Sequence, residues 1–193
     1  MYTLLAISVL VVVFDQLSKT IVATNMAVGD SIVIIKNILS FTFVKNEGAA
    51  WGILANHRWV FLVLTAIAII AIPIITYKFR EFGYFFGVSM SLIWGGAIGN
   101  MIDRLFYGKV VDFIEVTFID YPVFNIADSC VVIGGIMLFI YLVFINKTLF
   151  KSDGKKKKTE AQQVTEATGT AESQEKPAEE SQAKDKNDED KND

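Results

Sequence analysis

The sequence predicts an α-helical integral membrane protein with four transmembrane helices, a small extracytoplasmic β-cradle and a disordered C-terminal tail. Three observations support this fold class. Four apolar segments occur in the first 150 residues, and each has the about 20 residues that a helix needs to cross a hydrocarbon core of ~30 Å. The loop after the first segment is rich in β-branched and aromatic residues, which is typical of strands. Residues 151–193 contain almost no large apolar side chains.

The four apolar segments lie at about 2–23, 59–77, 82–102 and 126–145. The first has no basic N-terminal region, and apolar residues resume after Lys19, where a cleaved signal peptide would carry small residues. We therefore expect it to remain as a membrane helix. Pro73 lies in the second segment, where a membrane helix tolerates proline. The glycines at 95–99 should let the third segment pack closely against a neighbouring helix.

Two connections are expected on the outer side of the membrane, at about 26–57 and 105–122. In the first, residues 31–35 and 39–44 are rich in β-branched and aromatic side chains and predict two short strands. We expect them to form a small sheet on the membrane surface. Trp51 follows them and is predicted either to anchor at the level of the lipid headgroups or to contact substrate.

The charge distribution predicts that both termini are cytoplasmic. Four spans place the two ends on one side, and the connection between the second and third spans carries Lys78 and Arg80. The lysine run at 155–158 decides the orientation by the positive-inside tendency. Nine Lys and twelve acidic residues lie in 151–193, whereas residues 1–150 hold nine of each sign. The net charge of −3 thus belongs to a disordered cytoplasmic tail that follows a membrane domain at 1–150, and it indicates no nucleic-acid partner.

Four acidic residues are predicted to reach the outer end of the bundle. Asp15 lies towards the outer end of the first segment, Asp103 closes the third, Asp112 lies in the second outer loop and Asp128 begins the fourth. A carboxylate costs several kcal/mol near hydrocarbon, so each is a functional candidate. Random placement would scatter these residues between the two faces. Their common depth predicts a reaction centre near the outer face.

Asp112 and Asp128 are the predicted catalytic pair. Apolar residues precede each of them and should place both carboxyl groups in a partly dry site. Two carboxyl groups held close together do not both ionise easily, so one retains a proton. The ionised one can take a proton from water while the protonated one polarises a carbonyl group. This is peptide hydrolysis of the aspartic type, and we expect no cofactor and no metal.

Two asparagines are predicted to support this pair. Asn100 precedes Asp103 by three residues, and Asn125 precedes Asp128 by the same spacing, so the members of each pair share a helical face. Their amides could orient the acids or hold substrate backbone. An alternative is that Asp128 only caps the N-terminus of the fourth helix.

Two ion pairs are also expected. Lys19 lies four residues after Asp15 on the same helical face, which favours a pair between them over a role for Lys19 as a base. Arg104 is the expected partner of Asp103, and this pairing makes a structural role for Asp103 the preferred interpretation.

The same residues are compatible with functions other than peptide hydrolysis. A proton- or ion-coupled transporter would also place carboxyl groups in helices, but it would normally have them near the midplane, often with internal repeats. A Ser18–Lys19 pair fails because adjacent residues point to different faces. A hard cation held by Asp103, Asp112 and Asp128 stays open, since carboxylates suit such ions, and sensitivity to EDTA would reveal it.

Five motifs occur in an order that resembles a known family. They are Asp15-Gln-Leu-Ser-Lys19, Asn46-Glu-Gly-Ala-Ala-Trp-Gly52, Gly95-Gly-Ala-Ile-Gly-Asn-Met-Ile-Asp-Arg104, Val110-Val-Asp-Phe-Ile114 and Phe124-Asn-Ile-Ala-Asp128. Together they are similar to the successive motifs of bacterial lipoprotein signal peptidase, the type II signal peptidase. The resemblance covers roughly residues 10–135.

The resemblance implies an aspartic endopeptidase of the bacterial cytoplasmic membrane that cuts prolipoproteins just before the cysteine carrying diacylglycerol. It also implies sensitivity to globomycin-type inhibitors, and we expect a monomer surrounded by membrane lipid. The catalytic pair of the family falls on Asp112 and Asp128. Its supporting polar residues fall on Asp15, Lys19, Asn46, Asn100, Asp103, Arg104 and Asn125.

Overall fold

Four long helices and a three-stranded sheet make up the part of the chain that the structure, a computed structural model, describes, namely residues 2–48 and 57–145. The helices are α1 (Tyr2–Asn25), α2 (Arg58–Lys78), α3 (Gly83–Phe106) and α4 (Ile126–Ile140). A short helical turn, η2 (Arg80–Phe82), precedes α3, and a π-helical turn, η3 (Tyr141–Ile145), continues α4. Trp51 and the tail at 151–193 lie outside the described residues.

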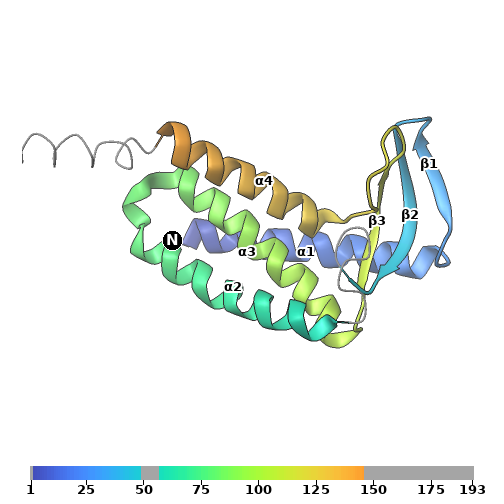
Figure 1. Ribbon diagram of the computed structural model, residues 1–193, viewed down its shortest axis with the longest axis horizontal. Coiled ribbons are helices and arrows are strands. Elements are labelled where there is room, and N and C mark those ends of the chain that lie inside the picture. Colours follow the sequence, from blue (N-terminus) through green and yellow to red (C-terminus); the bar gives the residue numbers. More distant parts are fainter. Residues whose placement is uncertain (1, 49–56, 146–193) are drawn as a thin grey trace, which may run out of the picture. The chain divides into compact units, whose positions relative to one another are not determined.

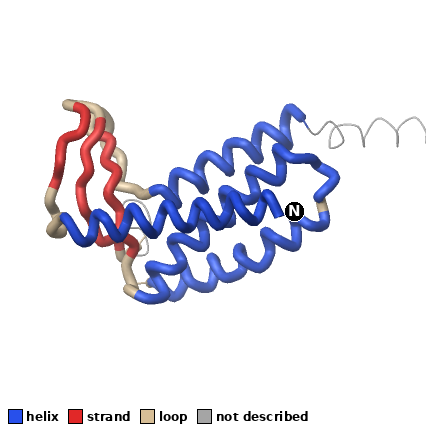
Figure 2. The backbone as a smooth tube through the Cα atoms, turned by 180° about the vertical axis from the view of Figure 1, so that it is seen from behind, coloured by secondary structure: helices blue, strands red, loops and turns tan. Residues whose placement is uncertain are grey.

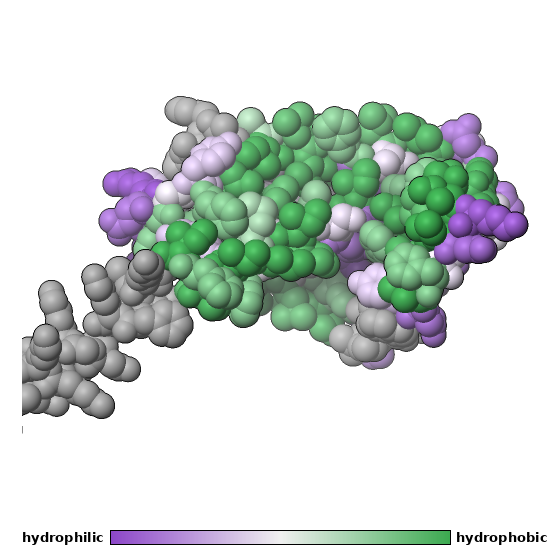
Figure 3. All heavy atoms as spheres, turned by 90° about the horizontal axis from the view of Figure 1, so that it is seen from above, coloured by the Kyte–Doolittle hydropathy of each residue, from purple (hydrophilic) through white to green (hydrophobic). Residues whose placement is uncertain are grey.

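All four helices are long and apolar enough to cross a membrane, which confirms the four predicted spans. The third span extends one turn further than expected, to Phe106 rather than about residue 102. Asp103 and Arg104 therefore lie within α3 instead of closing it. Large apolar side chains are exposed along the helices, including Phe14, Ile70 and Phe139. On the face shown in Figure 3, apolar residues cover most of the helical part, as a lipid-facing surface requires.

Helix α3 is the centre of the bundle, because it packs against α1, α2 and α4 (Figure 1). Its glycines allow this close packing. A Cβ atom at Gly95 would lie 2.8 Å from Val11 Cβ of α1, and one at Gly99 would lie 2.5 Å from Asp15 Oδ2. The packing expected from the glycine-rich run at 95–99 is thus confirmed, and it brings the polar end of α1 against α3.

The sheet stands at one end of the bundle, across the ends of α1 and α3 and the start of α4 (Figure 2). It consists of β1 (Ser31–Ile35), β2 (Leu39–Asn46) and β3 (Val110–Val116), antiparallel and in that order. The first two strands were predicted. Residues 110–116 were predicted only as part of an outer loop. This prediction was incomplete, because β3 becomes a strand by pairing with β2 across more than sixty residues of chain.

A small apolar cluster attaches the sheet to the bundle. Phe43 of β2 and Phe113 of β3 are buried against Val22 of α1. Phe41 meets Phe113 edge-on, with the ring centroids 5.8 Å apart. Because side chains alternate along a strand, Asp112 points to the opposite face from its neighbour Phe113. The cluster therefore fixes the strand that carries Asp112 while turning its carboxyl group away from the apolar contact.

Candidate active site

Asp112 lies in the middle of β3, opposite Val44 of β2. Its side chain is 2% exposed and accepts two hydrogen bonds. Asn46 Nδ2 donates to Oδ2 at 2.9 Å, and Asn125 Nδ2 donates to Oδ1 at 2.6 Å. Burial raises the pKa of the Asp112 carboxyl to about 6. The bond from Asn46 opposes this rise, and the negative charge of Asp128 adds to it. Asp112 is therefore placed to hold a proton in weakly acidic solution.

Asp128 lies in the first turn of α4, where it forms a capping box with Asn125. Asn125 Oδ1 accepts from the backbone N–H of Asp128 at 2.9 Å, and Asp128 Oδ2 accepts from the backbone N–H of Asn125 at 3.2 Å. The other oxygen, Oδ1, accepts from Asn100 Nδ2 at 2.7 Å. Asp128 thus has the capping role that the sequence suggested, although Asn125 is the cap residue itself. Negative charge is also favourable at this end of a helix.

Asn125 connects the two aspartates. It is fully buried, donates to Asp112 through its amide and donates to Asp128 through its backbone. The same amide nitrogen also donates to Asn100 Oδ1 at 3.1 Å. Each of the four carboxyl oxygens of the two aspartates therefore accepts one N–H donor from an asparagine. This arrangement holds two acidic groups from β3 and α4 around one shared residue.

Lys19 lies behind Asn100 and is 3% exposed. Its ammonium group is 2.8 Å from Asp15 Oδ2 and 3.1 Å from Asp103 Oδ2, and it donates to Asn100 Oδ1 at 2.9 Å. An ammonium group can only donate, so it requires the carbonyl side of the Asn100 amide to face it. The NH2 group of Asn100 must then face Asp128. The expected pair between Lys19 and Asp15 is confirmed.

Asp15 and Asp103 each hold a neighbouring element in place. Asp15 Oδ1 accepts from the backbone N–H of Ala127 at 2.9 Å, in the first turn of α4. Asp103 Oδ2 accepts from the backbone N–H of Val111 at 3.1 Å, beside Asp112 in β3. Gln16 adds a bridge, because its Nε2 donates to Asp103 Oδ1 at 3.0 Å and to the carbonyl of Gly99 at 3.1 Å. These contacts set the positions of the two elements that carry Asp112 and Asp128.

The expected ion pair between Asp103 and Arg104 is wrong, because the ion-pair partner of Asp103 within the described residues is Lys19. Consecutive residues on a helix point about 100° apart, so the two side chains leave α3 in different directions. Arg104 donates to the carbonyl of Gly48 at 3.2 Å and lies over the ring of Phe61, 4.8 Å from its centroid. It therefore connects α3 to α2 and to the end of the described part of the first outer loop.

No group of three or more His, Cys, Asp or Glu side chains suited to a metal occurs among residues 2–48 and 57–145. The Asp103 carboxylate pairs with Lys19 and accepts a hydrogen bond from Gln16. The carboxyl oxygens of Asp112 and Asp128 accept hydrogen bonds from asparagines instead.

Comparison with known proteins identifies the family of this chain. The family model described as signal peptidase (SPase) II matches residues 7–144, which include all three strands, α2, α3 and α4, and α1 from its second turn onwards. The chain belongs to the signal peptidase II family. Proteins named lipoprotein signal peptidase in Staphylococcus aureus strains JH9 and Newman are 44% identical over 143 residues, which cover 73% of this chain and 88% of each relative.

Two solved structures also resemble the chain, and both are described as bacterial membrane enzymes. The one at 2.3 Å resolution has a TM-score of 0.72 and 43% identity, covering 77% of this chain and 90% of its own. The one at 1.9 Å resolution has a TM-score of 0.70 and 43% identity, covering 75% and 94%. Membership of the signal peptidase II family makes the chain a peptidase with membrane-spanning helices.

The structure of this signal peptidase II homologue joins eight of the ten candidate residues in one hydrogen-bonded network. They are Asp15, Lys19, Asn46, Asn100, Asp103, Asp112, Asn125 and Asp128. Arg104 lies at the edge of this network, and Trp51 lies outside the described residues. Gln16 was not singled out by the sequence analysis. It lies three residues before Lys19 on the same helical face, and that spacing was the available signal.

Proposed function

We propose that this protein removes signal peptides from prolipoproteins by an aspartic mechanism, cutting just before the diacylglyceryl-modified cysteine. The observation that carries the proposal is the pair of buried acids, Asp112 and Asp128, held around Asn125. The family suggests the substrate class, since similar proteins are named lipoprotein signal peptidases. The substrate must enter laterally from lipid, because both the signal-peptide helix and the acyl chains arrive from the bilayer.

The two acids have different roles in the proposed reaction. Asp128, at the N-terminus of α4, takes a proton from the attacking water. Asp112 carries the proton that its raised pKa retains and gives it to the carbonyl oxygen of the scissile bond. The resulting diol collapses as its hydroxyl returns a proton to Asp112. Asp128 then gives its proton to the departing amine, so the pair ends in its starting state.

Residues around the pair act as positioning residues in this proposal. Asn46, Asn100 and Asn125 fix the directions of the carboxyl groups. Asp15, Lys19 and Asp103 hold the elements on which the pair stands. We also propose Trp51 and Arg104 as supporting residues, with Arg104 fixing the first outer loop through Gly48.

The proposed placement is in a bacterial cytoplasmic membrane, with both termini inside and the reaction near the outer face. Lys78 ends α2 and Arg80 begins η2, at the end of the bundle opposite the sheet, which supports this orientation (Figure 1). Residues 1–150 form the peptidase unit, and 151–193 a cytoplasmic tail. We propose that the unit acts as a monomer and binds inhibitors of the globomycin type.

The test of cleavage uses the purified full chain in detergent micelles with a diacylglyceryl-modified prolipoprotein. Mass spectrometry of the products should place the cut immediately before the lipidated cysteine, and EDTA should leave the rate unchanged. A cut elsewhere would contradict the proposed specificity. Loss of activity in EDTA, restored by Mg²⁺, would contradict the metal-free mechanism. No cleavage by a folded protein, together with proton flux in liposomes, would favour the transporter instead.

A further inference from the structure

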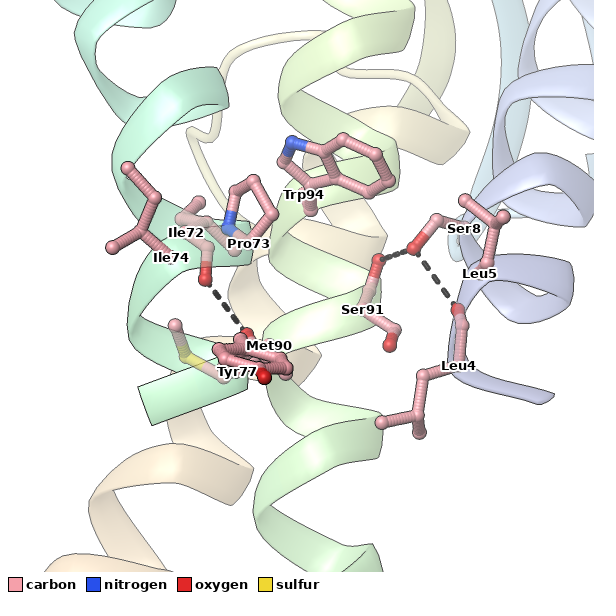
Figure 4. Close-up of a pocket in the computed structure, with 11 residues that line it drawn as sticks. Leu4, Leu5, Ser8, Ile72, Pro73, Ile74, Tyr77, Met90, Ser91 and Trp94 are labelled. Atoms are coloured by element: carbon pink, nitrogen blue, oxygen red, sulfur yellow. Dashed lines mark hydrogen bonds between the residues drawn. The ribbon is translucent and has the colours of Figure 1, made fainter. Parts of the chain in front are cut away.

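A groove lies between α1 and α2, away from the candidate active site. It has a volume of about 490 Å³ over the inner half of α3, within the usual size range of ligand pockets. Figure 4 shows Leu5 of α1 on one side, Pro73, Ile74 and Tyr77 of α2 on the other, and Trp94 of α3 between them. Trp94 precedes Asn100 by six residues, which is ~9 Å along the helix. The groove therefore begins closer than the two aspartates to the end of the bundle opposite the sheet.

The serine and threonine hydroxyl groups on the wall of this groove donate hydrogen bonds within the protein. Ser8 Oγ donates to the carbonyl of Ser91 at 2.9 Å (Figure 4). Ser91 Oγ donates to the carbonyl of Gly87 at 2.8 Å. Thr76 Oγ1 donates to the carbonyl of Ile72 at 2.7 Å. Because each of these hydroxyl groups already donates its proton to a backbone carbonyl, the groove suits an apolar ligand.

Trp94 is fixed in the groove by an irregularity in α2. Proline has no N–H, so Pro73 leaves the carbonyl four residues earlier, that of Ile69, without its helical donor. Trp94 Nε1 donates to this carbonyl at 2.9 Å. The indole ring is thereby held as part of the groove wall, where it can report on any molecule that enters.

The inner end of the groove carries positive charge. Tyr77 lines this end, and the Arg80 guanidinium lies over its ring, 5.1 Å from the centroid. Lys78 follows Tyr77 in sequence, and the short turn after α2 contains Arg80 and one acid, Glu81. An apolar groove that ends at exposed cations, at the depth where the helices end, matches a lipid with an acyl chain and a negatively charged headgroup.

We infer that this groove binds one anionic phospholipid, with an acyl chain along Trp94 and its phosphate beside Arg80. The lipid fills the wedge between α1 and α2, which both pack on α3. Because it would bind the folded state alone, it would stabilise the bundle. The inference does not rest on the proposed peptidase function.

Trp94 provides the test. The full chain with Trp51→Phe and Trp59→Phe keeps Trp94 as its one tryptophan. We expect its fluorescence in detergent micelles to be quenched saturably by phosphatidylglycerol with dibrominated acyl chains. Phosphatidylcholine with the same chains should bind about fivefold more weakly, since one basic residue near a lipid surface contributes ~1 kcal/mol. Arg80→Gln should remove that difference.

Two matched variants decide where the lipid binds. Ile74→Phe adds bulk to a residue that lines the groove and should abolish the saturable phase, whereas Ile75→Phe adds the same bulk on the same helix outside the lining and should keep it. Equal binding by both variants, or quenching that never saturates, would overturn the site. Equal affinity for the two lipids in the wild-type background would overturn the anionic headgroup.

Discussion

Asn125 donates a hydrogen bond of 2.6 Å to Asp112, and this contact joins the start of α4 to the middle of β3. Asn125 also caps α4 and donates to Asp128 from its backbone. Asn125 thus caps the N-terminus of α4, which carries Asp128, and also binds Asp112 on β3. The local structure of α4 and the geometry of the candidate active site depend on the same side chain.

Removing the amide donor of Asn46 should raise the pKa of Asp112 further, because its hydrogen bond stabilises the charged carboxylate. If Asp112 acts as the acid, kcat/KM should fall as the pH rises through this pKa, near 6 in the wild type. In Asn46→Ala, the pH at which kcat/KM begins to fall should be higher than in the wild type. If kcat/KM is lower by the same factor at every pH and the pH of this fall is unchanged, the role of Asp112 as the acid would be contradicted.

The burial of Asp112 should make the stability of the protein depend on pH. Its pKa of about 6 in the folded state lies above the value of about 3.9 for an unfolded aspartate. The folded state thus binds more protons between these values, and its stability should fall as the pH rises from about 4 to about 6. Asp112→Asn should flatten this part of the curve. Thermal unfolding of both proteins in micelles measures the effect, and parallel curves would contradict it.

Lys19→Met should strongly destabilise the protein. It would leave Asp15 and Asp103 without the ammonium group that lies within about 3 Å of both, and breaking a buried ion pair costs about 3–5 kcal/mol. Chemical unfolding in micelles measures the loss. Wild-type stability in Lys19→Met would show that this network does not hold the bundle together.

A double-mutant cycle should distinguish the two possible partners of Asp103. Lys19 and Asp103 are in contact, so their coupling should reach about 0.5–3 kcal/mol. Arg104 points towards Gly48 instead, and its coupling to Asp103 should be smaller. Chemical unfolding of the single and double variants provides the comparison. The reverse order of coupling energies would contradict the observed pairing.

Deleting residues 155–193 should leave peptidase activity nearly unchanged, because the network of candidate residues lies between Asp15 and Asp128. The rate of prolipoprotein cleavage by the truncated and full chains is the measurement. A large loss in the truncated, folded protein would show that the tail contributes to catalysis or substrate binding.

The membrane spans and the first two strands were predicted well, because a run of about twenty apolar residues or of β-branched side chains indicates its structure without knowledge of distant contacts. The strand β3 was missed, since Asp112 interrupts a short apolar run and only pairing with β2 makes it a strand. The Lys19–Asp15 pair followed from helical spacing. The Lys19–Asp103 contact did not, because it joins α1 to α3 through the close approach at Gly99. Adjacency in sequence instead suggested Arg104, the wrong partner.

The most direct test of the central claim compares three substitutions in the purified full chain acting on a diacylglyceryl-modified prolipoprotein. Asp112→Asn and Asp128→Asn should abolish cleavage while the protein stays folded in the membrane fraction. Glu115→Gln should cleave at nearly the wild-type rate, because Glu115 is an acid of the same strand, β3, but is bonded to Thr42 outside the network. Near wild-type cleavage by either aspartate variant would contradict the two-aspartate mechanism.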